Sequence, residues 1–307
     1  MMSYAFARII GFLCTLLLLV TAAFFVIRLA PGGPFDEERT LLPVVRANLE
    51  AAYGLDVPLV TQFRRYVTGL AHGDFGPSFK HTDTTVGELL GRGLPVSAAL
   101  GAAALALALL VGVPLGFLAA LRRGSALDHA AAMVTAAAIA MPAFVLGPLL
   151  ALGVGLRLGW LPAAGWDGGA LRHAVLPVLT LAAPAVAYSA RLARTGLLEV
   201  LGSDYIRAAR ARGLGQSQIV RAHALRPALL PLVGWLGPAA AFVLTGSLVV
   251  ETVFGVPGAG RFLVEGALNR DYTLVMGMIV VYGTITLACN LAADLAYGWL
   301  DPRIRRH

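Results

Sequence analysis

The chain has 307 residues, of which 58% are hydrophobic and 13% charged, and its mean hydropathy is +0.77. A soluble domain carries about a quarter charged residues, so this composition excludes a water-soluble globular enzyme and predicts a membrane protein. The 24 basic and 17 acidic residues leave a net charge of +7. Cytoplasmic loops of membrane proteins collect such an excess, so it needs no nucleic-acid partner.

Six stretches without Asp, Glu, Lys or Arg are long enough, or nearly so, to cross a bilayer, which takes about 20 residues. They are residues 9–27, 96–121, 130–156, 174–190, 227–250 and 272–293. The first stretch could be a signal peptide, but its length and the lack of a clear A-x-A site favour an uncleaved helix. We therefore expect an all-α, polytopic fold with six transmembrane helices.

The arginines indicate the orientation of these spans. An even number of spans places both termini on one side, and most arginines fall on that side, above all in the loop 191–226. The two short loops opposite carry only Arg157, Arg172, Arg261 and Arg270. Because cytoplasmic loops are enriched in Lys and Arg, both termini are expected in the cytoplasm.

Four parts follow along the chain. Residues 1–30 form the first transmembrane helix, and residues 31–95 form an external, periplasmic loop. Residues 96–299 form a five-helix core that includes the cytoplasmic loop 191–226, and residues 300–307 form a cytoplasmic tail.

The external loop has its own predicted structure. It begins with Pro31-Gly32-Gly33-Pro34, which breaks the first helix. Residues 44–54 and 58–70 have helical spacing and are expected to form short helices at the membrane surface.

Motifs for covalent chemistry are missing from the sequence. There is no GxxxxGK[ST], HExxH or GxSxG, and the six histidines are scattered. Cys14 and Cys289 lie in apolar runs without a CxxC, which predicts two buried thiols and no metal. Glu251, Asn290 and Asp294 lie near the ends of spans, where an interfacial or helix-pairing role is favoured over proton coupling. The chain is expected to be no enzyme and to hold no cofactor.

The cytoplasmic loop is the most informative segment. Ser203 or Asp204 is a suitable N-cap for a helix that begins near Tyr205. In that helix Ile206, Ala209 and Gly213 share a narrow face of small and apolar residues, and Gly213 can take the left-handed conformation that ends a helix. A second helical stretch, residues 217–225, follows. Such a unit suits docking in a partner's groove; the alternative is a solvated basic loop that only sets orientation.

The same segment resembles the EAA loop of ATP-binding-cassette (ABC) importer permeases. The resemblance rests on Arg207-Ala208-Ala209-x-x-x-Gly213, followed by His223-Ala224-Leu225 and Pro227. Arg207 stands where the general pattern has Glu, and the closing proline comes one residue later. The basic wording Ala-Arg-Ala-Arg-Gly resembles the peptide-importer branch, so these departures point to that branch.

Further stretches along nearly the whole chain resemble the B-type permeases of oligopeptide and dipeptide importers. They are residues 28–32, 250–254 with Pro257-Gly258, 268–272 and 300–304. The external-loop residues 70–79, Leu-Ala-His-Gly-Asp-Phe-Gly-Pro-Ser-Phe, are most similar to the oligopeptide branch.

The resemblance implies the ABC type I importer permease (MetI-like) fold in a bacterial inner membrane. It also implies a heterodimer with a C-type permease, two ABC ATPase subunits that bind ATP and Mg, and an extracytoplasmic peptide-binding protein. Oligopeptides would be the substrates. The alternatives are a related importer for dipeptides, nickel or glutathione, a stand-alone secondary carrier, and a membrane scaffold.

The resemblance also implies two sets of site residues. Coupling to the nucleotide-binding subunit would fall to Ile206, Arg207, Ala208, Ala209, Arg210, Gly213, Leu214 and Gly215. The outer loops would receive the binding protein at Trp160, Trp166, Pro257, Gly258, Asn269 and Arg270.

Overall fold

The computed structural model describes residues 2–29, 43–81, 83–245 and 247–300. Every element within these ranges is a helix, apart from one isolated β-bridge between Pro77 and Thr85. The all-α prediction is therefore confirmed. The predicted helix break at residues 31–34 and, apart from Leu300, the predicted tail 300–307 lie outside the described residues.

The helices follow one another along the chain with short connections. They are α1 (Met2–Leu29), α2 (Pro43–Ala52), α3 (Leu59–Ala71), α4 (Val86–Leu107), η1 (Ala108–Gly112), α5 (Val113–Leu121), α6 (Ala126–Ala140), α7 (Ala143–Leu150), η2 (Ala151–Arg157), η3 (Asp167–Gly169), α8 (Leu171–Leu201), α9 (Asp204–Ala211), α10 (Gln216–Ile219), η4 (Val220–Ala224), α11 (Leu225–Ala228), α12 (Leu230–Thr245), α13 (Leu248–Phe254), α14 (Gly260–Leu268) and α15 (Tyr272–Leu300).

Five of these helical stretches are long and apolar enough to cross a membrane, and a bent pair makes a sixth. The pair joins α6 to α7 and η2 at an angle of 105°. The span predicted over residues 130–156 corresponds to this pair, which is sharply bent between Ala140 and Ala143. Met141 precedes Pro142 and takes an extended conformation, with ψ of 113°, because the proline ring disfavours the helical one.

Two predicted spans are longer than the uncharged runs that indicated them. The helix of the second span begins at Val86, inside the predicted loop 31–95, because the Thr85 side chain caps it by accepting from the Glu88 amide at 3.2 Å. The fourth continues to Leu201, past Arg191. Charged side chains ended the runs in the sequence without ending the helices. The predicted short helices at 44–54 and 58–70 are confirmed as α2 and α3.

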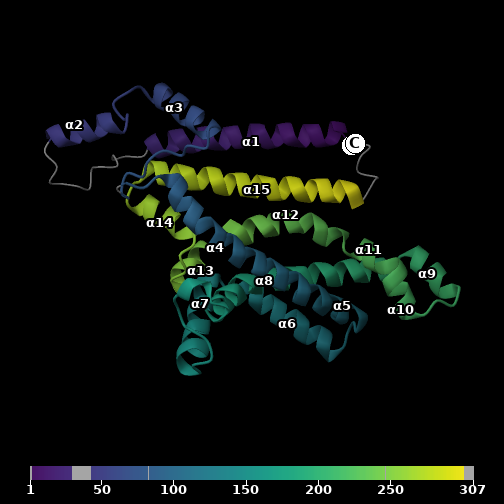
Figure 1. Cartoon of the computed structure of the whole chain (residues 1–307). Coiled ribbons are helices and arrows are strands. Elements are labelled where there is room, and N and C mark those ends of the chain that lie inside the picture. Colours follow the sequence, from purple (N-terminus) through teal and green to yellow (C-terminus); the bar gives the residue numbers. More distant parts are fainter. Residues whose placement is uncertain (1, 30–42, 82, 246, 301–307) are drawn as a thin grey trace.

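The helices form an elongated bundle in which the first and last lie side by side (Figure 1). Arg8 of α1 and Asp294 of α15 form an ion pair at 3.1 Å, so the two helices run in opposite directions. At the end where α1 begins and α15 ends lie α9 and α10, whereas α2, α3 and α14 lie at the other end. Six crossings of the bundle account for this arrangement.

Two glycines, one at the end of η1 and one in α5, draw this span against α8. A Cβ on Gly112 would lie 1.9 Å from the Ser189 Oγ, and a Cβ on Gly116 would lie 2.2 Å from the Ala190 carbonyl oxygen. The spacing Gly112-x-x-x-Gly116 is therefore used for close packing, as small residues at this interval often are. The preceding π-helical turn leaves the Ala108 carbonyl to accept from Ser189 at 2.7 Å.

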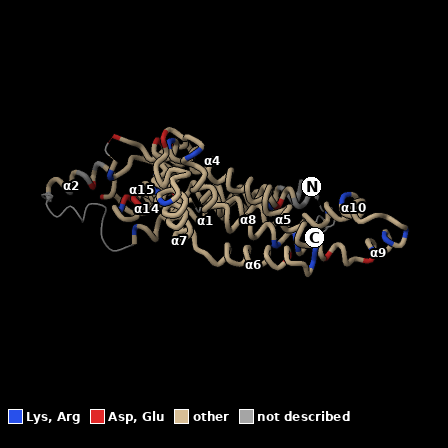
Figure 2. Tube along the Cα trace, turned by 90° about the horizontal axis from the view of Figure 1, so that it is seen from below, with Lys and Arg blue, Asp and Glu red and all other residues tan. Residues whose placement is uncertain are grey.

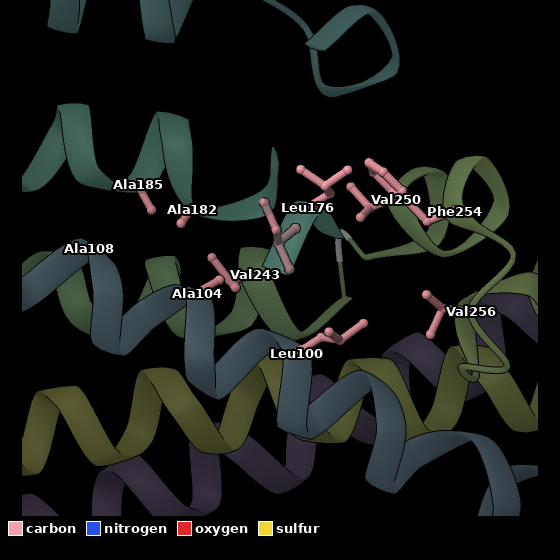
Figure 3. Packing of buried hydrophobic residues seen from close by; sticks show 11 residues of the cluster. Leu100, Ala104, Ala108, Leu176, Ala182, Ala185, Val243, Val250, Phe254 and Val256 are labelled. Atoms are coloured by element: carbon pink, nitrogen blue, oxygen red, sulfur yellow. The ribbon is translucent and has the colours of Figure 1, made fainter. Parts of the chain in front are cut away.

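The main core lies where four helices meet. Side chains of α4, α8, α12 and α13 converge there, among them Leu100, Leu176, Val243 and Phe254 (Figure 3). All four are at most 3% exposed. A second cluster, with Val20, Phe24, Met276 and Val280, joins α1 to α15.

Candidate functional site

The helix α9 projects from the end of α8 and carries the residues assigned to coupling. Ser203 occupies the N-cap position, but its hydroxyl donates to the Val200 carbonyl at 2.6 Å and caps no helix amide. Asp204 in the first turn forms an ion pair with Arg207, which suits the positive end of the helix dipole. The predicted start of this helix is thus correct to within one residue.

Two of the predicted coupling residues point into the chain itself. Ile206 and Ala209 are at most 1% exposed. Their cluster also contains Ala120, Leu197, Ile219, Ala224 and Ala228. The sequence interpretation gave this face to a partner's groove, and that was wrong for these two side chains. The chain folds back at Gly213 and places α10 against α9, while α11 packs on α8 in the same cluster, so the groove is intramolecular.

The remaining coupling residues form the exposed surface of α9 and its turn. Exposed positions are Arg207, Ala208, Arg210, Gly213 and Gly215, whereas Leu214 is half-buried. Gly213 has φ of +85°, the left-handed conformation that the sequence predicted, and no atom lies within 4 Å of the place where a Cβ would stand.

Tyr205 and Arg212 belong to the same exposed surface and were not among the predicted residues. Tyr205 is 47% exposed although it is aromatic. A large amphipathic side chain beside a row of arginines was the available signal, because such residues are enriched at protein interfaces. Arg207, Arg210 and Arg212 give α9 and its turn a basic rim, seen as blue segments at α9 in Figure 2.

An ion pair braces the bundle near this end. Arg194 of α8 donates to both carboxylate oxygens of Asp128 on α6, at 2.7 and 2.9 Å, and the Gly124 amide donates to the same group at 3.0 Å. Asp128 is buried, so this bidentate pair is better ordered than an exposed one. A cavity of about 350 Å³ between α5, α6 and α8 opens beside Arg194.

The predicted docking residues at the other end divide into accessible and inaccessible ones. Trp160 is 67% exposed, and its carbonyl accepts from Arg172 at 3.2 Å. Asn269 is also exposed. Trp166 is half-buried and contacts the main core, while Gly258 is buried.

The other two predicted docking residues, Pro257 and Arg270, are half-buried. The Gly165 amide donates to the Phe254 carbonyl at 2.8 Å, which joins the loop before α8 to the end of α13. The two predicted outer loops therefore meet.

Two buried carboxylates organise the connections at this end, and the sequence did not single out their bonding. Asp271 is fully buried and accepts from the Ser78 hydroxyl at 2.5 Å and the Phe79 amide at 3.0 Å. It also accepts from the Leu274 amide in the first turn of α15 at 3.0 Å. Glu251 of α13 accepts from three further donors. Ser78 and Phe79 lie more than 190 positions from Asp271, so no local pattern in the sequence reveals these bonds.

An aromatic cavity lies between α6, α8 and α12. Its volume is about 420 Å³, and Tyr188, Trp235 and Phe242 line it together with Pro184 and Pro238. The rings of Tyr188 and Trp235 lie 6.3 Å apart. Cavities between helices are common places for small molecules to bind.

No metal or thiol chemistry stands out in the described part of the chain. No group of three or more His, Cys, Asp or Glu side chains there could hold a metal ion. The prediction of two buried thiols was wrong for Cys14, which is exposed on α1, while Cys289 is half-buried. An apolar run places a residue in the membrane, and this does not bury it against protein.

Comparisons with known proteins agree on one family. Residues 112–306 match the family described as "Binding-protein-dependent transport system inner membrane component". The chain is 45% identical to the oligopeptide transport system permease protein OppB of Salmonella typhimurium and 47% identical to that of Haemophilus influenzae, each over 99% of this chain and all of the relative. It is 42% identical to the dipeptide permease DppB of Bacillus subtilis, over 100% of this chain and 99% of the relative.

Solved structures share the fold at lower identity. An inward-facing structure of the MetNI methionine ABC transporter matches with a TM-score of 0.59 and 20% identity, over 69% of this chain and 96% of that one. An amino acid ABC transporter matches with a TM-score of 0.52 and 21% identity, over 68% of this chain and 92% of that one.

Proposed function

Since the chain belongs to the binding-protein-dependent transport system inner membrane components and is a permease subunit of a peptide ABC importer, we propose that it serves oligopeptide uptake across a bacterial inner membrane. The observation that carries the substrate class is the identity of 45–47% to oligopeptide permeases over the full length. Identity to dipeptide permeases is lower, at 42% and 36%. A dipeptide importer is the nearest alternative.

The proposed orientation places α9 and both chain ends in the cytoplasm. Its support is the crowding of exposed arginines at the end of the bundle that holds α9 and α10 (Figure 2). Cytoplasmic segments next to spans are enriched in such residues. The end with α2, α3 and α14 would then face outward, where a peptide-binding protein would deliver its load.

Coupling is proposed to occur through the exposed surface of α9. An ATPase subunit would bind Arg207, Ala208, Arg210 and the turn at 213–215, where exposed arginines and a small side chain are available. Ile206 and Ala209 would serve from the inside, because their burial against α5 and α8 turns a push on α9 into a movement of those spans.

The partners follow from the same proposal. A C-type permease would complete the pathway, two ABC ATPases would sit below, and a peptide-binding protein would dock above at Trp160, Pro257 and Asn269. ATP and Mg bound by the ATPases would supply the energy. The part that belongs to this chain is to receive that movement at α9 and to change the packing of its spans.

The proposal is tested by purifying the tagged chain from its native membrane and identifying what accompanies it. We expect two ATPase chains, a second multi-span permease and a peptide-binding protein. The purified assembly, placed in lipid vesicles with ATP inside, should import a labelled oligopeptide more rapidly than a dipeptide.

Two results would contradict the proposal. A chain that purifies alone and still transports would be a secondary carrier. An assembly that prefers dipeptides would keep the importer assignment and overturn the substrate class. A control with the Gly213→Val variant separates coupled import from leak, because leak through the vesicles does not depend on α9.

A further inference from the structure

A buried carboxylate joins three helices at the end of the bundle opposite α9. Glu251 of α13 is 1% exposed. Its Oε1 accepts from the hydroxyls of Ser97 on α4 and Ser247 at the start of α13, each at 2.5 Å. Its Oε2 accepts from the amide of Gly260, the first residue of α14, at 2.8 Å. One side chain thus holds α4, α13 and α14 together.

The surroundings of this carboxylate are suited to an anion. Within the described residues no Lys, Arg or His side chain is bonded to it, so hydrogen bonds replace a counter-ion. Two hydroxyls and a backbone amide are strong donors to a carboxylate. The amide also belongs to the N-terminus of α14, where the helix dipole favours negative charge. The Glu251 carboxylate is therefore stabilised by three hydrogen-bond donors, which would be left unpaired beside an apolar side chain.

The loop before α14 closes directly over the carboxylate. A Cβ on Gly258 would lie 2.2 Å from the Glu251 carboxyl carbon. A Cβ on Gly93 of α4 would lie 2.7 Å from the Ala259 nitrogen, which itself donates to the Ser97 Oγ at 2.8 Å. With no side chain between them, α4 and this loop cannot shift past each other without breaking these hydrogen bonds.

The span that begins with α4 reaches the cluster around Ile206 and Ala209 at its opposite end. From α4 through η1 to α5 it forms one apolar stretch of 36 residues, Val86–Leu121. Ser97 lies near one end, and Ala120 near the other belongs to the cluster that buries Ile206 and Ala209. Close packing of Gly116 against α8 stiffens the part between. A continuous set of contacts therefore runs from α9 to Glu251.

We propose that Glu251 is a positioning residue for transport. Through Ser97 it fixes α14 and the loop 255–260 to α4, so that movement entering at α9 reaches the outer surface along α4 and α5. This inference rests on the proposed function, since the movement has to come from an ATPase subunit. The response of the outer surface to ATP would then depend on a buried carboxylate as well as on the exposed residues that meet the binding protein.

Hydrogen–deuterium exchange on the assembled importer in lipid nanodiscs tests this, with and without a non-hydrolysable ATP analogue. In the unmodified assembly the analogue should change the exchange of peptides covering both 204–215 and 255–268. In Glu251→Ala the change at 204–215 should remain and the change at 255–268 should disappear. Peptide import should fall by about tenfold or more, the scale expected for lost hydrogen bonds to a charged group.

Matched variants separate positioning from misfolding. Thr135→Ala removes another buried hydroxyl, bonded only within α6, and should leave both exchange changes intact. Glu251→Gln keeps the shape of the side chain without its charge, so its loss of peptide import should be smaller. It serves as the test variant if Glu251→Ala assembles poorly. ATPase activity without binding protein should stay within about twofold in all assembled variants, because neither Glu251 nor Thr135 belongs to the α9 cluster.

The outcomes separate a failure of the proposed function from a failure of the role of Glu251. If no ATPase assembles on the unmodified chain, the proposed function fails, and the role of Glu251 fails with it. If the unmodified assembly imports peptide but the change at 255–268 is absent, or persists in Glu251→Ala, the positioning role alone is overturned. Adding Ser97→Ala to Glu251→Ala should cost less import than the product of the two single losses, because between Ser97 and the loop only the bond from the Ala259 amide remains to be lost. A multiplied loss would show that Ser97 and Glu251 act separately.

Discussion

At the end of the bundle that holds α9, the connecting segment is anchored by apolar side chains, whereas at the opposite end the connections are anchored by buried carboxylates. Ile206 and Ala209 lie in a cluster of apolar side chains, and such contacts have no required direction. Glu251 and Asp271 accept hydrogen bonds from fixed donors, and such bonds weaken steeply when their angles change. The comparison indicates that α9 and its turn can tilt, although the Asp128–Arg194 pair braces the spans beside them, whereas the outer connections stay in register.

The largest expected effect comes from the turn that ends α9. Gly213→Val forces a β-branched side chain into φ of +85°, which costs at least about 1–2 kcal/mol, although the site has room for it. Peptide import should fall by about tenfold or more while membrane insertion and the amount of chain are unchanged. Gly202→Val is the control, since Gly202 has φ of −84°. Equal losses in both variants would contradict the role of the turn.

A comparison of neighbouring residues on α9 sharpens the distinction between its two faces. Ile206→Ala should lower the free energy of unfolding by about 2–5 kcal/mol, because it opens a cavity in the α9 cluster. Tyr205→Ala removes an exposed side chain and should change stability by no more than about 0.5 kcal/mol while reducing ATPase recovery on purification. Thermal unfolding in detergent and the yield of co-purified ATPase measure these effects. A stable Ile206→Ala would show that α9 is not anchored as described.

More of the structure could be predicted from the sequence at the α9 end than at the carboxylate end, for a physical reason. The helical start near Asp204 and the left-handed Gly213 are local properties, and both were predicted correctly. The burial of Ile206 depends on where α10 and α11 lie, and an apolar face looks the same whether its groove belongs to a partner or to the chain. The bonding of Glu251 needs Ser97, which is 154 positions away, so no local pattern could reveal it.

The spans show the same limit. Counting uncharged residues found every crossing, but it ended the second at Val96 because Arg92 and Glu88 intervene, whereas the helix begins at Val86. The count also gave no measure of the 105° bend at Pro142, because the apolarity of a run indicates its length in the membrane and not the direction of its helix.

At the carboxylate end, Asp271→Asn is expected to act on the outer surface alone. It weakens the acceptor of the Ser78 hydroxyl and the Phe79 amide, a loss of about 1.5–3 kcal/mol for hydrogen bonds to a charged group. Stimulation of ATPase activity by peptide-loaded binding protein should fall, while the recovery of ATPase subunits is unchanged. Reduced recovery would mean that the two ends are not separate.

The smallest effect concerns the two tryptophans of the outer loop. Trp160→Ala should leave stability within about 0.5 kcal/mol, since the side chain is 67% exposed, and should weaken binding-protein stimulation. Trp166→Ala should lower stability more, because that ring contacts the main core. Unfolding midpoints of the two variants decide this. The reverse order would contradict the placement of the loop.

The central claim is that the exposed face of α9, and not its buried face, meets the ATPase. Cysteine cross-linking tests it most directly, in a chain whose Cys14 and Cys289 are replaced by serine. Ala208→Cys and Ala209→Cys differ by one position, yet Ala208 is exposed and Ala209 is 1% exposed. The account predicts a cross-link from Ala208→Cys to a co-purified ATPase subunit and none from Ala209→Cys. A cross-link from Ala209→Cys alone, or from neither, would contradict it.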